Sequence, residues 1–205
     1  MKICNIYSHL NGEEFLLARK PAIWKEIQDV IRRVDAAKCK TKRSKEKRTS
    51  GRTFYAPVEL NKEFKAEFAA CNPPWKKDEF SYFVCSDERV NRSIQNLDRG
   101  EQKQLILDAG LEPLPTSNET DFVKDRVAVE VQFGKYSFVA HDLYVKHLAF
   151  YATDRIDVGV EILPSKVLER EMSSGPTFFE KDLNNLIRQG RGVPSVPLIV
   201  IGVGP

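Results

Sequence analysis

Three apolar segments in the second half of the chain restrict its fold more than any other feature. Residues 126–133, 156–163 and 196–203 read as strands, and the last of them, VPLIVIGV, is apolar throughout and long enough for one buried strand. Residues 138–152 and 180–190 lie between them and are typical of helices. This alternation predicts an α/β fold with one central mixed β-sheet flanked by helices.

The first half of the chain contributes further helices and shorter extended pieces. The segment from Pro21 to residue 37 has apolar residues at helical spacing, which predicts an amphipathic helix. With 205 residues and no segment that reads as a linker, we expect a single domain over residues 1–205. The other expected elements are strands at 1–8 and 79–85 and helices at 61–70 and 99–110.

Composition excludes several classes of protein. Apolar residues make up 41% and charged residues 30%, as in ordinary globular proteins. No segment approaches the roughly 20 apolar residues of a membrane span, and the beginning of the chain does not read as a signal peptide, so we expect a cytoplasmic protein. The four cysteines form no Cys-x-x-Cys pair, which argues against a zinc site and favours plain, mostly buried thiols.

Residues 38–52 carry a dense positive charge. The stretch KCKTKRSKEKRTSGR contains eight Lys or Arg and one Glu, whereas the whole chain has a net charge of only +3. Two interpretations are open: a solvated, mobile loop, or a loop that contacts nucleic-acid phosphates.

An acidic residue interrupts the most strand-like segment. Glu130 and Gln132 lie two residues apart in VAVEVQF, so on a strand they point to the same face, opposite to Val129, Val131 and Phe133. Asp121 lies nine residues before Glu130, and a turn through residues 124–126 can bring the two carboxylates together. Two converging carboxylates repel unless a cation lies between them.

Oxygen ligands of this kind suit Mg²⁺, which can activate water and neutralise the charge that develops on a phosphodiester. A simpler interpretation is open as well. Glu130 can pair with Lys124 or Arg126 at the end of an edge strand, without any catalytic role.

The order of these residues resembles the PD-(D/E)xK nuclease pattern. The segment TDFVKDRVAVEVQFGK is similar to the active-site segment of the BglII/BstYI-type family of type II restriction endonucleases, in which Gln replaces the usual Lys. The resemblance extends over essentially the whole chain and is closest to the BstYI type. Further segments that carry it are YSHLNG, FYATDRIDVGVEILP, EMSSG and IRQGRGVP.

The resemblance implies a restriction-endonuclease-like fold and a Mg²⁺-dependent site. Asp121 and Glu130 would be metal ligands together with the backbone carbonyl of Val131, and Gln132 would position the attacking water. Since Gln132 cannot act as a base, metal-bound water, a substrate phosphate or bulk solvent must receive the proton. Asp125 fits the chemistry but not the spacing, so it is the weaker alternative to Asp121.

The resemblance also implies a homodimer on double-stranded DNA with one active site per strand, and a companion DNA methyltransferase in a bacterial host. The expected target is a palindrome with a GATC core, R^GATCY, cut to leave 5′ four-base overhangs. Lys135 and Ser174 would face the outer base pair, where a Lys donor can reach N7 of either purine. By itself, Ser174 reads as a turn-stabilising hydroxyl.

Three further residues are candidate DNA ligands. Ser173 can contact the inner bases. Arg188 and Arg191 can read guanine or hold a phosphate, although arginines near a helix end also stabilise the helix dipole. Two other functions stay open beside the restriction enzyme: a repair-type nuclease of the same fold that cuts by DNA shape, and a DNA-binding module without catalysis.

Overall fold

The computed structural model describes residues 1–44, 50–134, 136–172 and 175–205. The chain divides into two compact units, one made of residues 1–76 and 121–205 and the other of residues 77–120. The organisation as a single domain over 1–205 stays a prediction. Among the described residues, no helix is long and apolar enough to cross a membrane.

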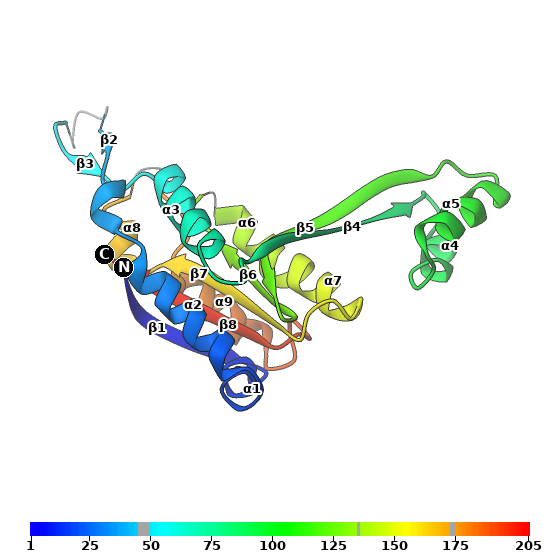
Figure 1. Ribbon diagram of the computed structural model, residues 1–205. Coiled ribbons are helices and arrows are strands. Elements are labelled where there is room, and N and C mark those ends of the chain that lie inside the picture. Colours follow the sequence, from blue (N-terminus) through cyan, green and yellow to red (C-terminus); the bar gives the residue numbers. More distant parts are fainter. Residues whose placement is uncertain (45–49, 135, 173–174) are drawn as a thin grey trace. The chain divides into compact units, whose positions relative to one another are not determined.

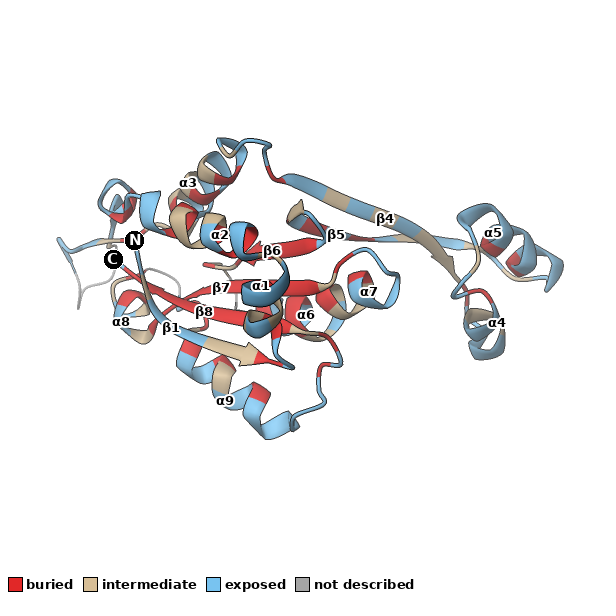
Figure 2. Ribbon diagram, turned by 60° about the horizontal axis from the view of Figure 1, so that its bottom comes forward, coloured by how far each residue is buried: buried red, intermediate tan, exposed pale blue. Residues whose placement is uncertain are grey.

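The chain forms a mixed β-sheet with the strand order β1-β8-β7-β6-β5-β4, and β1, β8, β7 and β6 lie at the centre of the first unit. The parallel strands β6 (Val127–Val131), β7 (Val158–Pro164) and β8 (Leu198–Gly204) lie side by side, and β1 (Lys2–His9) pairs antiparallel with β8 (Figure 1). Every residue of β6, β7 and β8 is buried (Figure 2). Burial on both faces explains their apolar sequences and confirms the predicted fold class.

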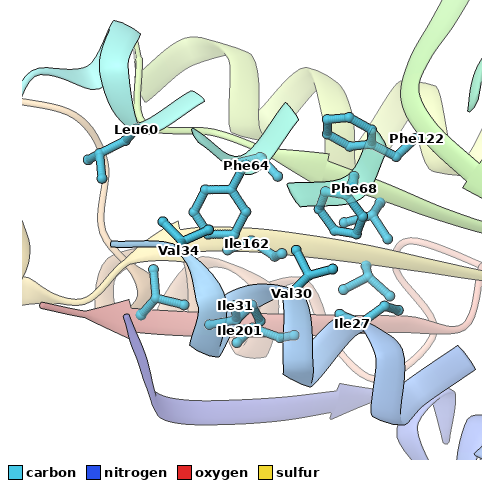
Figure 3. Packing of buried hydrophobic residues seen from close by; sticks show 14 of the residues in the cluster. Ile27, Val30, Ile31, Val34, Leu60, Phe64, Phe68, Phe122, Ile162 and Ile201 are labelled. Carbon is cyan, nitrogen blue, oxygen red and sulfur yellow. The ribbon is translucent and has the colours of Figure 1, made fainter. Parts of the chain in front are cut away.

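Two helices cover one face of this sheet. In Figure 3, side chains of α2 (Pro21–Arg33) and α3 (Pro57–Ala69), among them Ile31 and Phe64, point toward Ile162 and Ile201 of the sheet. The helix predicted to reach residue 37 ends at Arg33. Its continuation is a short 3₁₀-helix, η1 (Ala36–Cys39), because the Asp35 side chain accepts a hydrogen bond from the backbone N–H of Ala37 and caps a new turn.

The opposite face of the sheet carries the helices of the last third of the chain. Helices α6 (Tyr136–His141) and α7 (His147–Ala152) are joined by a π-helical segment, η3 (Asp142–Lys146). Together with α9 (Phe179–Gln189) they bury a second apolar cluster. Its buried members are Val139, Leu143, Leu163, Phe179, Leu186, Val196, Leu198 and Val200.

The second unit has its own small core of Cys85, Ile94 and Ile106. It contains nearly all of β4 (Lys76–Val84), helices α4 (Glu88–Ser93) and α5 (Arg99–Asp108), and the first part of β5 (Leu114–Lys124). The sequence pattern did not predict β5.

Short elements complete the description. Helix α1 (Gly12–Arg19) follows β1, and α8 (Lys166–Glu169) follows β7. In the basic segment, β2 (Lys42–Arg43) pairs with β3 (Thr53–Phe54). The predicted mobility of 38–52 falls partly on residues 45–49, which lie outside the described residues. All four cysteines are free thiols, but only Cys39 and Cys85 are buried.

Candidate active site

A tight hairpin between β5 and β6 sets the position of the acidic residues. Asp125 and Arg126 form its two-residue turn and both have positive φ, 46° and 59°, as a turn that matches the strand twist requires. The strands pair antiparallel with Lys124 opposite Val127. In this register the backbone N–H of Asp121 lies 3.4 Å from Oε1 of Glu130, to which it donates. The structure therefore places the backbone of Asp121 beside the Glu130 carboxylate, and the use of both carboxylates as metal ligands stays a prediction.

The charged residues of the turn have other partners. Asp125 is paired with Lys20, and Arg126 is paired with Asp154 and Asp157. Nζ of Lys124 lies 2.7 Å from Oε1 of Glu26. The simpler interpretation, in which Glu130 pairs with Lys124 or Arg126, is thus not what the structure shows.

Glu130 pairs instead with a lysine from the neighbouring helical segment. Nζ of Lys146 lies 2.8 Å from Oε1 of Glu130 and 2.9 Å from Oδ1 of Asp142. Only 3% of Glu130 is exposed, and the Lys146 side chain is 16% exposed. One ammonium group therefore bridges two buried carboxylates.

The side chain of Gln132 is held at both ends of its amide. Its Oε1 accepts a hydrogen bond from the backbone N–H of Gly134 at 3.1 Å, and its Nε2 donates to Oδ2 of Asp142 at 3.4 Å. Asp142 therefore contacts both Gln132 and Lys146, and Lys146 in turn contacts Glu130. A side chain held in this way can orient a small ligand such as water.

A second buried acid lies on the next strand. Glu161 of β7 is paired in register with Glu130 of β6, and it is fully buried. Its Oε2 lies 3.4 Å from Nε2 of His147, whereas its Oε1 has no hydrogen-bond partner among the described residues. The ring of His147 fits there because residue 159 is glycine: a Cβ at Gly159 would lie 2.4 Å from Nδ1 of His147.

Burial controls protonation throughout this group. It raises the pKa of Glu130 to about 8, although Lys146 acts in the opposite direction. Burial and the nearby Asp142 and Glu130 carboxylates raise the pKa of Glu161 well above its usual value. Burial also lowers the pKa of His147 to about 3, so the imidazole is neutral. For Lys146, burial opposes the charge, but the two carboxylates outweigh it and raise the pKa.

The predicted ligand set consists of oxygen atoms, which suits a hard divalent cation. Asp121 and Glu130 offer carboxylates, and Val131, the next residue of β6, offers a backbone carbonyl. The ammonium of Lys146 shows that this place accepts a positive charge at hydrogen-bond distance. Among the described residues, however, no three His, Cys, Asp or Glu side chains form a ready metal cage.

The candidate DNA ligands are only partly described. Lys135, Ser173 and Ser174 lie outside the described residues, so their predicted roles stay predictions. Arg188 is in the last turn of α9 and Arg191 follows that helix, and both are exposed. Helix α9 packs on β8, so these arginines come from a different element than the acidic residues.

Sequence reasoning missed Asp142, Lys146 and Glu161. A signal was present for the first two, because an acid and a lysine four residues apart can pair on a helix. A signal was present for Glu161 as well, since VGVEILP repeats the pattern of a lone acid in an apolar strand. Neither signal shows that all three surround Glu130.

The sequence of this chain matches one protein family, and its fold is similar to solved structures of the same type. Residues 4–203 match the family described as restriction endonuclease BglII/BglIII. Two solved structures are similar over 100% of this chain: BglII complexed with a DNA 16-mer (21% identity, TM-score 0.63) and free BglII (20% identity, TM-score 0.58). This chain covers 79% and 80% of theirs. No curated protein sequence is significantly similar.

Proposed function

The chain belongs to the restriction endonuclease BglII/BglIII family, and from this premise we propose that it cuts both strands of DNA at R^GATCY in the presence of Mg²⁺. It is a type II restriction endonuclease, a site-specific phosphodiester hydrolase. Its family generally uses a divalent metal. The choice of Mg²⁺, the GATC core, the outer purine–pyrimidine pair and the 5′ four-base overhangs are parts of the proposal.

One observation carries the catalytic part of the proposal: the β5–β6 hairpin brings Asp121 to the carboxylate of Glu130. Gln132 follows two residues later and contacts Asp142, which shares Lys146 with Glu130. We assign Asp121, Glu130 and the Val131 carbonyl to the metal, and Gln132 to the attacking water. Bound there, Mg²⁺ would lower the pKa of water and neutralise charge on the phosphate.

The chain's own residues orient the reactants. Gln132 is fixed by Gly134 and Asp142, so its amide can hold a water molecule in one direction but cannot take its proton. The proton acceptor is therefore outside this residue: metal-bound water, a substrate phosphate or bulk solvent. Asp121 is exposed and can meet a substrate directly, whereas Glu130 behind it is buried.

Reading of the DNA sequence is assigned to residues beyond the acidic group. Lys135 and Ser174 would meet the outer base pair, and Ser173 the inner bases. Lys135 follows the catalytic strand directly, and a flexible ammonium can reach N7 of adenine or guanine. Arg188 and Arg191 would contact guanine or phosphate, which their exposure permits.

A palindromic target requires two equivalent active sites, so we propose that the enzyme acts as a homodimer. Such an enzyme would destroy the DNA of its host unless a companion methyltransferase protected it, which implies a bacterial cytoplasmic restriction–modification pair. One of the similar structures is a DNA complex, which supports double-stranded DNA as the substrate class.

The test is a digest of DNA of known sequence with Mg²⁺ and with EDTA, followed by sequencing of the ends. Metal-dependent cuts confined to RGATCY support the whole proposal. Cuts only at AGATCT would keep the enzyme class but contradict the assignment of Lys135. Cuts at varied sequences would favour a repair-type nuclease. Binding without any cut would favour a DNA-binding module.

A further inference from the structure

The ammonium of Lys146 contacts both buried carboxylates, Glu130 and Asp142, whereas the other basic side chain at Asp142, His141, keeps its Nδ1 3.9 Å from Oδ1. Its two N–O distances, 2.8 and 2.9 Å, are nearly equal, so the group is shared between the two acids. Such charge-assisted hydrogen bonds are the strong kind, and here they are shielded from water.

The local backbone is built to deliver this lysine. Asp142 and Lys146 begin and end the π-helical segment η3, in which the backbone N–H of His147 bonds to the carbonyl of Asp142. Short π-segments are rare and are frequently found at functional sites. Asp142 and Lys146 are four residues apart and share one side of this segment, from which Lys146 reaches Glu130.

The acidic side chains around Lys146 carry more negative charge than one ammonium can neutralise. Asp121, Glu130 and Asp142 carry up to three negative charges, which Lys146 reduces by one. Gln132 adds none. If the ammonium moved away, the two buried carboxylates would be left without a compensating charge unless another cation replaced it. A divalent ion bound by Glu130 is such a cation.

We propose that Lys146 is the internal counter-ion of this site, a positioning residue that holds the carboxylates of Glu130 and Asp142 in the metal-free protein and competes with the divalent cation for Glu130. The inference rests on the proposed function in one respect, the assignment of Glu130 as a metal ligand. Loading of the site then requires Lys146 to withdraw from Glu130, while Asp142 can keep it nearby, beside Gln132.

The experiment measures calcium binding to the DNA-free protein by titration calorimetry, so that no cleavage enters the result. In Lys146→Met the competing ammonium is gone, and the calcium dissociation constant should fall at least tenfold, about 1.4 kcal/mol. Lys146→Arg keeps a cation and should stay within about threefold of wild type. A purely structural role of Lys146 predicts weaker binding in Lys146→Met, since the ligands would lose their order.

Lys124→Met is the matched control. Its side chain is 12% exposed and 2.7 Å from Glu26, close to the 16% and 2.8 Å of Lys146 and Glu130, but it packs against Trp75 instead of the acidic group. Its calcium affinity should stay within twofold of wild type. If Lys124→Met tightens binding equally, net charge alone explains the effect and the proposal fails.

Two further outcomes separate this inference from the proposed function. Calcium binding that is unchanged or weaker in Lys146→Met overturns the inference even if the wild-type enzyme cuts DNA. Tighter binding in Lys146→Met supports it even if the wild type cuts nothing, which would sink the proposed function alone. Thermal unfolding verifies that each variant folds, and Lys146→Gln, which keeps a donor but no charge, replaces Lys146→Met if that variant does not fold.

Discussion

Glu130 and Glu161 occupy paired positions on the parallel strands β6 and β7, and both are buried. Within the described residues, Glu130 alone of the two has a lysine partner, whereas Glu161 contacts the neutral His147. Burial and the neighbouring acids raise the pKa of Glu161 well above its usual value. The folded protein therefore binds a proton on Glu161 at a pH where the unfolded chain has released it.

Burial also raises the pKa of Glu130 to about 8, so the metal-free protein should lose stability as the pH rises from about 6.5 toward 8. The folded state holds more protons than the unfolded state in this window, so the free energy of unfolding falls, by about 1.4 kcal/mol per pH unit for each such group. Glu161→Gln should reduce the slope. His147 does not contribute there, since its pKa is lowered to about 3 and the unfolded imidazole is also mostly neutral above pH 6.5.

Urea unfolding at several pH values measures the slope. Glu88→Gln is the control, because the Glu88 side chain is 75% exposed and lies far from this group in the sequence. A slope that Glu161→Gln leaves as steep as in wild type would show that Glu161 is ionised in the folded protein.

Asp121 and Asp125 differ in their predicted contribution to catalysis. Asp121→Ala should reduce cleavage at least a thousandfold and leave DNA binding within a few-fold, because it removes a proposed metal ligand. Asp125→Ala should keep cleavage within about tenfold while losing about 1–2 kcal/mol of stability, since Asp125 holds a left-handed turn position at φ 46°. Single-turnover cleavage and filter binding test both; equal loss in the two variants would contradict the assignment.

Glu130→Ala should abolish cleavage as well, with DNA binding largely kept. Here the reason is the loss of the buried carboxylate that Asp121 approaches. Because this change also leaves Lys146 with Asp142 alone, Glu130→Gln is the better-matched variant, which keeps size and hydrogen bonding. Normal cutting by Glu130→Gln would show that the active site is elsewhere.

Gly159→Ala should destabilise the protein by roughly 1–3 kcal/mol, as overpacking of a closed core does. The added Cβ would lie 2.4 Å from Nδ1 of His147 and 2.6 Å from Cδ2 of Leu198, so the imidazole must move away from Glu161. Thermal unfolding measures the loss. Gly192→Ala is the control, because a Cβ there would meet nothing within 4 Å. Equal melting temperatures for wild type and Gly159→Ala would contradict the close packing.

Lys135→Asn should change the preference at the outer base pair. The lysine ammonium can donate a hydrogen bond to N7 of either purine. An Asn side chain is suited to adenine, with which it can form two hydrogen bonds. The ratio of cleavage rates at AGATCT and GGATCC should shift toward AGATCT. An unchanged ratio would remove Lys135 from the residues that read the DNA.

The apolar pattern predicted the centre of the fold well. Fully buried strands such as β8 appear in the sequence as a continuous apolar run. In α2, the spacing of the apolar residues indicates the buried face, and Pro21 marks the start of the helix. The long strand β5 was missed, since its first part belongs to the second unit and is largely exposed, so that polar residues outnumber the apolar ones.

The acidic pair was also predictable, because a short turn between two strands can be read from local spacing. The lysine that pairs with Glu130 could not be predicted in this way. Lys146 arrives from a helical segment 16 residues away, and its direction depends on how η3 packs on the sheet. Contacts of that kind are set by tertiary packing, which a residue pattern does not contain.

The turn at Asp125 and Arg126 has a consequence for how a chain of this type can change in evolution. Substitutions around the acids leave the strand pairing in place, so specificity and rate can be altered one residue at a time. Insertion or deletion of a single residue in that turn is different. It would shift β5 by one position and turn Asp121 to the face covered by α2 and α3. The loop length here should therefore be far less variable than the residues that occupy it.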